Sequence, residues 1–379
     1  KADFTNIFLE RTTHNGPNVI TSEGHRWKHV RKSTSTAFNP ANLKKMIGPI
    51  DAILETWVES VLEPCMKTQN PINILNEMNT ITAQVIADVA FDYQFESGER
   101  EAFLHDLSIC WKEFGEAPTN PLSSLPVTEL LFPGLWRGRG AAKRMYGFCG
   151  KILQAYREKS NAPEGRKEHK LIDMILYDME YADDAERCRD LMAYMIGGFD
   201  TTACTLSFAL RALAMNQSEQ TKLRHQLRSH QSPGDARNCK QLKMTIKETL
   251  RMYPATAMGS FRKLGKDIVL PWSKKILPKG SWVLTQYYCM QRDPGVFEDP
   301  NTFMPDRWEN ATAEQTKSIM LFSVGRRGCQ GQGLANLEMN ELLYKLISKY
   351  RFDVVEEGEP QSIVFFKPVG TLLSVSLAD

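Results

Sequence analysis

The sequence contains no closely spaced cysteines. Its eight cysteines are scattered along 379 residues and never form a C-x-x-C pair. In a chain of this size, such spacing indicates reduced thiols that are mostly buried as small apolar side chains. The pattern therefore excludes a disulfide-stabilised secreted scaffold and favours an intracellular protein.

The sequence also has almost equal numbers of positively and negatively charged residues. The chain has 47 Lys and Arg against 45 Asp and Glu, and the basic residues do not gather in one block, so no electrostatic argument favours nucleic-acid binding. No apolar run approaches the roughly 18 residues that span a membrane. Because linkers, repeats and low-complexity tracts are absent too, we expect a single domain over residues 1–379.

Helical periodicity runs through most of the chain. Thr21 and Ser22 are typical helix caps and precede an amphipathic run. A long, mostly apolar segment over 185–215 predicts a helix that runs through the core rather than over the surface. Further helices are predicted at 72–91, 140–159 and about 332–349.

Short strands are predicted after Pro254. Strand-type runs over 261–270 and 281–290 enclose the turn signal LPKG. Two more strands are expected near 350–355 and 371–377. The predicted fold class is therefore mainly α (α+β), with a large helical body around a long central helix and small antiparallel β-sheets at its side.

A single cysteine, Cys329, lies in the glycine-rich segment LFSVGRRGCQGQG. A lone cysteine is most often a packing residue, but this one directly precedes a helix, whose N-terminal dipole stabilises a thiolate. Gly325, Gly328 and Gly331 allow the backbone to turn tightly and to approach a bulky group. Arg327 can offer a bidentate hydrogen-bonding fork to a carboxylate. Together these features are typical of a haem iron ligand.

Two other roles for Cys329 are less well supported. A zinc site needs three or four clustered Cys or His ligands, and none lie nearby in the sequence. A catalytic thiol would need a histidine base, and the nearest one in sequence is His230, so only the fold could supply it. The loop alone therefore favours a haem-thiolate site.

The spacing Phe322-x-x-Gly325-x-Arg327-x-Cys329-x-Gly331 resembles the haem-binding signature of the cytochrome P450 family of haem-thiolate monooxygenases. Other landmarks of that family follow in its order, from about residue 21 to residue 340. The resemblance implies the cytochrome P450 fold, an oxidoreductase, and haem b (iron protoporphyrin IX) with Cys329 as the ligand of its iron.

The motif GGFDTT places two glycines inside the predicted central helix. Gly197 and Gly198 each cost roughly 1 kcal/mol relative to alanine, which suits either close helix packing or a groove that breaks the helix and admits dioxygen. The resemblance favours the groove. It assigns the hydrogen-bonding alcohol to Thr201 and a proton relay from solvent to Asp200.

Glu248 and Arg251 lie three residues apart on one predicted helix face. Alone, this spacing predicts an ordinary surface ion pair of little energetic value. The resemblance implies instead a buried group in which Arg307 joins the pair and all three charges satisfy one another. Its role would be structural, since it would hold the cysteine loop for haem incorporation.

Trp27 and Arg31 are four residues apart, so an indole N–H and a guanidinium point the same way on one helix face. On its own, this pattern also fits an amphipathic surface helix. The resemblance assigns both side chains to a haem propionate and adds Arg262 and Arg327. Four donors would then serve two carboxylates.

The resemblance also implies a substrate pocket lined by small or apolar side chains. These residues would equally suit a hydrophobic core, but as a pocket they predict a hydrophobic small-molecule substrate. They are Ala193, Ile196, Ala255, Met258 and Val369.

The resemblance further implies a flavoprotein partner of the NADPH–cytochrome P450 reductase type. The chain has no glycine-rich nucleotide-binding motif, which fits electrons that arrive from a separate protein. Basic side chains on the face beneath Cys329 would steer an acidic partner. Only 26 residues precede Trp27, so we expect an N-terminal segment with a membrane anchor beyond this sequence, in a eukaryotic, especially fungal-like, enzyme on the cytosolic face of the endoplasmic reticulum.

Two alternatives stay open. One keeps the haem-thiolate site in an isomerase, dehydratase or peroxygenase that needs no external electrons, although Thr201 disfavours it because family members that abandon oxygen activation often lose this alcohol. The other is a non-catalytic haem sensor or scaffold, which would leave Asp200 and Thr201 without a purpose.

Overall fold

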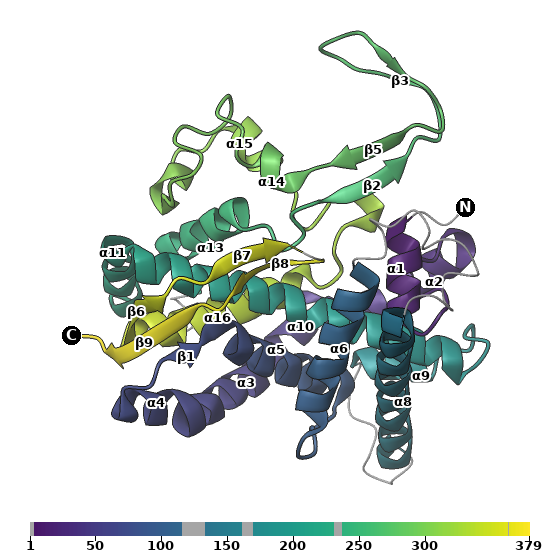
Figure 1. Cartoon of the computed structure of the whole chain (residues 1–379), viewed down its shortest axis with the longest axis horizontal. Coiled ribbons are helices and arrows are strands. Elements are labelled where there is room, and N and C mark those ends of the chain that lie inside the picture. Colours follow the sequence, from purple (N-terminus) through teal and green to yellow (C-terminus); the bar gives the residue numbers. More distant parts are fainter. Residues whose placement is uncertain (1–3, 116–132, 161–169, 231–236, 363) are drawn as a thin grey trace.

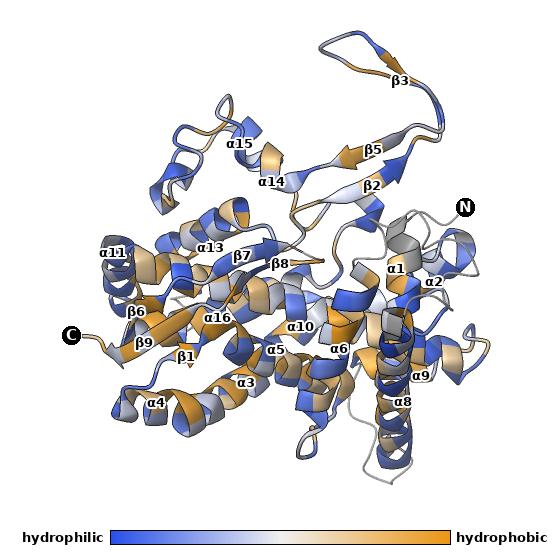
Figure 2. Cartoon of the chain, viewed as in Figure 1, coloured by the Kyte–Doolittle hydropathy of each residue, from blue (hydrophilic) through white to orange (hydrophobic). Residues whose placement is uncertain are grey.

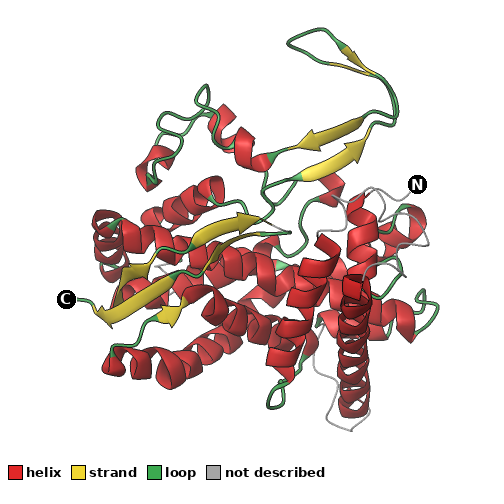
Figure 3. Cartoon of the chain, viewed as in Figure 1, coloured by secondary structure: helices red, strands yellow, loops and turns green. Residues whose placement is uncertain are grey.

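The computed structural model describes residues 4–115, 133–160, 170–230, 237–362 and 364–379. Helices dominate the described chain, and its strands gather in small antiparallel sheets (Figures 1 and 3). This arrangement confirms the predicted fold class. The α-helices are α1 (Phe4–Thr12), α2 (Gly24–Thr34), α3 (Pro40–Trp57), α4 (Glu63–Thr68), α5 (Ile74–Phe91), α6 (Glu99–Gly115), α8 (Pro133–Ser160), α9 (Leu171–Leu176), α10 (Asp184–Met215), α11 (Gln217–Arg228), α13 (Lys240–Met252), α14 (Tyr287–Met290), α15 (Ala313–Ser318) and α16 (Gln332–Lys349).

The central helix α10 is 32 residues long and starts one residue before the predicted boundary. Its first turn is capped by Asp183, whose side chain accepts a hydrogen bond from the backbone N–H of Glu186. Most of its side chains are buried, and it packs chiefly on α5 and α8. The main core therefore surrounds α10 and includes residues from Phe8 to Leu373.

The strands lie beside this helical body. A three-stranded sheet has the order β1-β9-β6, and three two-stranded ribbons pair β2 with β5, β3 with β4, and β7 with β8. The ribbon of β2 and β5 projects from the body and carries β3 and β4 at its far end (Figure 1). The strands are β1 (Ile72–Asn73), β2 (Ser260–Lys263), β3 (Ile268–Val269), β4 (Ile276–Leu277), β5 (Trp282–Thr285), β6 (Tyr350–Glu356), β7 (Glu359–Ser362), β8 (Phe366–Val369) and β9 (Leu372–Leu377).

Three local predictions are wrong. The N-cap of α2 is Glu23, without a side-chain cap bond, because the Thr21 hydroxyl accepts from the Asn18 backbone N–H instead and the Ser22 hydroxyl accepts from Arg26. The predicted strand over 281–290 ends early, since its last four residues form α14. The glycines of GGFDTT do not break α10, which is helical throughout.

Among the described residues, no helix combines the length and the apolar character that crossing a membrane requires.

Candidate functional site

The loop before α16 holds Cys329 in an exposed position. The backbone N–H of Cys329 donates to the carbonyl of Phe322 over 2.7 Å, and the N–H of Gly328 donates to Gly325 over 3.0 Å. Gly325 has φ +73°, a conformation that favours glycine. Gly331 is the N-cap of α16. The loop is therefore a compact turn that ends with the cysteine at a helix N-terminus.

Opposing effects act on the Cys329 thiol. Although the residue is exposed, enough of the chain surrounds its sulfur that burial raises the thiol pKa, while the backbone N–H of Gly331, the Arg31 charge and the backbone N–H of Gln332 act to lower it. These donors and this charge all stabilise a thiolate. The thiol thus lies in surroundings that would support the anion once a metal ion binds it.

Arg31, Arg262 and Arg327, here called the arginine cluster, lie close enough to influence one another. Desolvation lowers the pKa of Arg327; Glu23 opposes this, and the charges of Arg262 and Arg31 add to it. Among the described residues, Arg262 donates only to the carbonyl of its neighbour Phe261, over 3.1 Å. Within the described part of the chain, none of the three forms an ion pair. Because like charges repel, this cluster suits an anionic ligand.

The other two arginines of the cluster tie the cysteine loop to α2 and to the segment before it. Arg31 donates to the carbonyl of Gly328 over 2.6 Å, and Arg327 donates to that of Ser22 over 2.7 Å. The Arg327 guanidinium also lies 4.0 Å from the centre of the Trp27 ring, which is a cation–π distance. The four predicted propionate donors therefore come from α2, β2 and the cysteine loop.

One face of α10 is left uncovered by the part of the chain that the structure describes. Between Asp190 and Ala214, every residue is buried except four. The two glycines are adjacent, and each is three or four positions from Tyr194 and from Thr201, so the four lie on a single helix face. They are Tyr194, Gly197, Gly198 and Thr201.

The two glycines on this face have different surroundings. A Cβ atom on Gly198 would lie 2.7 Å from Cγ1 of Ile86 on α5, whereas a Cβ atom on Gly197 would meet nothing within 4 Å. Gly198 thus permits close helix packing, and Gly197 borders open space. Gly198 therefore fits the packing interpretation, while the open space at Gly197 lies beside an unbroken helix.

The polar residues after the glycines are held differently. Thr201 is partly exposed and donates from its hydroxyl to the carbonyl of Gly197 over 3.0 Å. Asp200 is only 1% exposed. Its carboxylate accepts from Lys367 over 2.7 Å and from the indole N–H of Trp111 over 2.8 Å. Asp200 therefore has no direct path to solvent and reaches the surface only through its lysine.

Lys367 was not predicted as a site residue. Burial lowers the pKa of this amine, but the charge of Asp200 and its hydrogen bond outweigh burial, so the pKa is raised overall. Lys367 lies on β8, 167 residues along the chain from its partner. No local pattern in the sequence could have indicated this contact.

A second group of missed residues links α10 to the cysteine loop. Gln330, next to Cys329, accepts from Tyr194 over 3.1 Å and donates to Thr34 over 2.9 Å. The hydroxyls of Thr34 and Tyr194 are 2.7 Å apart. This triangle places the uncovered face of α10 on the same side as the thiol. A tyrosine within an apolar stretch of the central helix and a glutamine beside the cysteine were the available signals.

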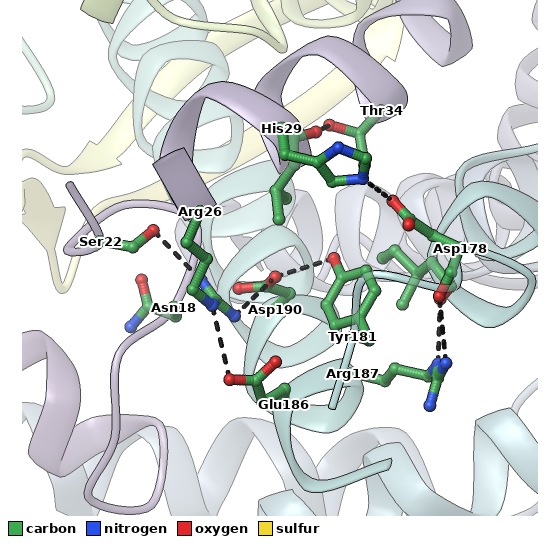
Figure 4. A network of polar contacts seen from close by, with 12 residues as sticks. Asn18, Ser22, Arg26, His29, Thr34, Asp178, Tyr181, Glu186, Arg187 and Asp190 are labelled. Atoms are coloured by element: carbon green, nitrogen blue, oxygen red, sulfur yellow. Dashed lines mark hydrogen bonds and ion pairs between the residues drawn. The ribbon is translucent and has the colours of Figure 1, made fainter. Parts of the chain in front are cut away.

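A network of charges anchors α2 to the start of α10 (Figure 4). Asp190 is fully buried, and burial raises the pKa of its carboxyl. It accepts from Arg26 over 3.2 Å and from the hydroxyl of Tyr181 over 2.8 Å. On the next turn of α2, His29 lies 2.7 Å from a carboxylate oxygen of Asp178. The helix that carries Trp27 and Arg31 is therefore fixed in place from the side opposite the cysteine loop.

Glu248, Arg251 and Arg307, here called the Glu248 group, form the buried cluster that was predicted as an alternative to a surface pair. Both Glu248 and Arg251 are 0% exposed. Two bonds of 2.9 Å join them, and Arg307 donates to the same carboxylate over 2.9 Å. The carboxylate also accepts from the backbone of Met304 and the indole of Trp308. Every charged side chain in the group thus has an ion-pair partner, and the two guanidinium groups share one carboxylate.

Two of the predicted pocket residues lie together. Ala193 and Ile196 line a narrow hollow with Trp111, between α10, α6 and the first segment of the chain. Its wall also includes the buried polar side chains of Thr12 and Asn18. Three other predicted pocket residues do not line this hollow, and they are Ala255, Met258 and Val369.

Comparisons with known proteins identify the family of the chain. The sequence model of the family "Cytochrome P450" matches residues 2–376. A Drosophila melanogaster protein named probable cytochrome P450 4aa1 is 26% identical over 91% of this chain and 70% of its own length, and rat cytochrome P450 4X1 is 25% identical over 92% and 75%. A crystal structure of a cytochrome P450 (CYP102L1) superimposes with TM-score 0.83 at 18% identity, covering 100% of this chain and 84% of that one. The chain therefore belongs to the cytochrome P450 family, whose members are haem-thiolate monooxygenases.

Proposed function

We propose that this chain is a single catalytic domain that oxidises a hydrophobic small molecule with electrons from a separate NADPH-dependent flavoprotein reductase. As a cytochrome P450, the protein is an oxidoreductase that uses haem b and dioxygen. The observation that carries the proposal is the uncovered face of α10, which the bond between Tyr194 and Gln330 joins to the neighbour of Cys329.

The residues present fit haem b. An exposed thiol, arginines without carboxylate partners and open space beside Gly197 match a thiolate ligand, two propionates and a flat macrocycle. Cys329 would hold the iron, while Phe322, Gly325 and Gly331 shape its loop. When bound, haem supplies a redox-active iron at which dioxygen is activated.

The arginine cluster and Trp27 would bind the propionates. Arg31 and Arg327 would exchange backbone carbonyls for carboxylates, and hydrogen bonds between ionised partners are roughly twice as strong as neutral ones. Arg262 would gain the most hydrogen-bonding energy from a carboxylate, because its present acceptor is the backbone carbonyl of the adjacent residue, Phe261.

Thr201 and Asp200 would control protons at the open face. The Thr201 hydroxyl donates to a carbonyl, so its lone pairs can accept a hydrogen bond from water held beside Gly197. Asp200 can exchange a proton with solvent only when its carboxylate separates from Lys367. We therefore expect this ion pair to open during proton delivery.

The Glu248 group would act structurally by fixing the segment before the cysteine loop. Substrate would bind beside Ala193 and Ile196, where the apolar wall suits a hydrophobic molecule.

The reductase would dock on the face that carries α2 and the cysteine loop. Lys28 and Lys32 on α2 and Arg326 in the loop are exposed there, and such charges accelerate encounter with an acidic partner. In the whole protein, we propose a location at the cytosolic face of the endoplasmic reticulum membrane.

The test is the absorption spectrum of the dithionite-reduced protein with and without carbon monoxide. A strongly red-shifted Soret band is expected for the chain and for Cys289→Ala, the control that removes the other exposed cysteine. Cys329→Ala should lack the band, and a surviving thiolate signal in this variant would refute the ligand assignment.

Turnover separates the proposed reaction from those that need no external electrons. Product should form with reductase and NADPH and should incorporate one oxygen atom from dioxygen. Product that forms without NADPH, or with peroxide alone, would instead favour the isomerase, dehydratase or peroxygenase.

A further inference from the structure

Four side chains that can donate hydrogen bonds lie where α8 and α10 meet the segment after α1. Helix α8, much of which is hydrophilic in Figure 2, packs on both α1 and α10. None of the four forms a side-chain hydrogen bond or an ion pair with any residue that the structure describes. They are called the donor group below and are His14, Lys143, Tyr146 and Arg189.

The donor group comes together from three parts of the chain. The ring centres of His14 and Tyr146 are 4.7 Å apart. Arg189 lies against the backbone of the same segment, since a Cβ atom on Gly16 would be 2.7 Å from its Nε atom. Lys143 is three residues before Tyr146 on α8, so the two share a helix face. The four side chains therefore face one place.

Positive charge accumulates at this place. Burial, followed by the charges of Lys143 and Arg189, lowers the pKa of His14. The Nε atom of Arg189 is buried and has no hydrogen-bond partner among the described residues. A buried donor without an acceptor is costly, and like charges repel one another. Both costs would fall if an anion bound here.

The carboxylates at the start of α10 do not supply this anion. Asp183 accepts a hydrogen bond from the backbone N–H of Glu186 over 2.8 Å. Asp184 forms an ion pair with Arg157 over 3.1 Å. Because both acids have other partners, the chain leaves the donor group open to an acceptor from outside.

The donor group is next to the hollow that was assigned to the substrate. On α10, Arg189 is one turn before Ala193, which lines the hollow, and Thr13, which also lines it, directly precedes His14. An α-helix rises about 1.5 Å per residue, so Arg189 lies about 12 Å along the axis from Gly197 and its open space. A molecule that reached both ends would need an anionic head and an extended apolar body.

We propose that the donor group anchors the carboxylate of an amphiphilic substrate whose apolar body extends along α10 toward Gly197. Arg189 can offer a bidentate fork to this carboxylate, while Lys143 and the Tyr146 hydroxyl can each add a single bond. The inference rests on the proposed function and names the substrate class for it. A ligand without an acidic group would leave the donors unpaired and would bind more weakly.

Calorimetric titration of the haem-loaded chain tests the proposal with three probes of similar apolar length. These probes are dodecanoate, dodecanol and methyl dodecanoate. Dodecanoate should bind at least about tenfold more tightly than the other two, because only its head is an anion. Added salt should weaken the binding of dodecanoate and leave that of dodecanol unchanged.

Variants of the donor group should act on dodecanoate alone. Arg189→Gln should weaken its binding by about tenfold or more, while dodecanol, which needs no anion site, should bind as before. Lys143→Gln and Tyr146→Phe should each weaken dodecanoate by less than about fivefold. These two changes on α8 keep the test available if Arg189→Gln does not fold.

The matched control is Arg100→Gln. The Nε atom of Arg100 is also buried without a partner among the described residues, but its guanidinium pairs with Glu101. This variant should bind all three probes normally. Equal affinity of the unmodified chain for the three probes would overturn the proposal. It would also be overturned if Arg189→Gln weakened dodecanoate and dodecanol alike, or if acetate bound as tightly as dodecanoate.

Turnover and the reduced carbon monoxide spectrum report separately on the proposed function. If the chain oxidised dodecanol with reductase and NADPH but did not prefer dodecanoate, the anchor would be refuted and the proposed function supported. If the chain preferred dodecanoate but lacked the thiolate spectrum and formed no product, the anchor would be supported and the proposed function refuted.

Discussion

The Glu248 group and the arginine cluster differ in what neutralises their guanidinium charges. In the Glu248 group, two arginines share one buried carboxylate, and further hydrogen bonds complete it. In the arginine cluster, the guanidinium groups bond to backbone carbonyls, and burial together with the charges of Arg262 and Arg31 lowers the pKa of Arg327. The first arrangement is complete without a ligand and the second is not. Arginines thus mark a structural core in one region and an anion site in the other.

Two further acids extend this comparison. Asp200 is buried with a single cation, Lys367. Glu338, on α16, is fully buried, and neither of its carboxylate oxygens has a hydrogen-bond partner among the described residues. Among the described residues, Glu248 is therefore paired with two cations, Asp200 with one and Glu338 with none.

The largest effect is expected from Glu248→Gln, which would leave two buried arginines without a carboxylate. Removing one partner from such a group costs about 3–5 kcal/mol, and five bonds to Glu248 favour the upper end. Urea unfolding and haem content measure this loss. The control is Glu309→Gln, whose exposed pair with Lys240 should contribute less than about 1 kcal/mol. Equal losses in the two variants would remove the distinction between a closed group and a surface pair.

Lys367→Met should rank second, because it leaves Asp200 buried with the indole of Trp111 and the weakly donating thiol of Cys204 as its remaining side-chain donors. We expect a loss of about 3 kcal/mol in unfolding free energy, at the lower end for a broken buried pair, since Lys367 is partly exposed. Lys345→Met, which removes a lysine from the surface carboxylates of Asp51 and Glu55, is the matched control. A variant that lost no more stability than this control would show that the Asp200 charge is already solvated.

Arg262→Gln should have a smaller effect that appears only with haem. Its guanidinium bonds to its own neighbour, so urea unfolding of the haem-free chain should not change. A bond to a charged group contributes about 1.5–3 kcal/mol, so haem transfer to apomyoglobin should accelerate by about tenfold. Lys263→Gln, the next residue on β2, should transfer haem at the normal rate. An equal acceleration in both variants would argue against a propionate at Arg262.

The smallest change, with the opposite sign, is expected from Glu338→Gln. Burial holds the pKa of Glu338 well above its ordinary value. The folded state thus binds the proton more tightly than the unfolded state. The stability that this proton contributes is complete below the ordinary pKa of a glutamate, and it is lost as pH rises from that pKa toward the raised pKa of the folded state. The amide cannot ionise, so the variant should gain on the order of 1 kcal/mol near neutral pH and show a flatter pH profile. Parallel stability profiles of the two proteins would contradict this assignment.

Periodicity and local spacing predicted much of this molecule. The apolar period located α10 to within one residue, and the predicted range of α16 matches its boundaries. The three-residue spacing of Glu248 and Arg251 was also informative, since residues so placed share a helix face. These features succeed because they depend on one element at a time.

Contacts across the chain could not be predicted in the same way. Tyr194 and Gln330 are 136 residues apart, and only the packing of α10 against the cysteine loop brings them together. The predicted break at Gly197 failed because helix hydrogen bonds continue through it, and the Thr201 hydroxyl adds a bond to the same carbonyl. The roles assigned to individual site residues stay predictions.

The adjacent glycines of α10 determine which substitutions each position can accept during evolution. Gly198 is constrained by Ile86, whose Cγ1 would lie 2.7 Å from an added Cβ atom. A smaller residue at position 86 would make room for a side chain at position 198. The two positions should therefore covary. Among the described residues, nothing beyond the neighbouring residues and backbone of α10 itself lies within 4 Å of a Cβ atom on Gly197. Substitution there has no internal compensation, and its tolerance would be set by what occupies the open space.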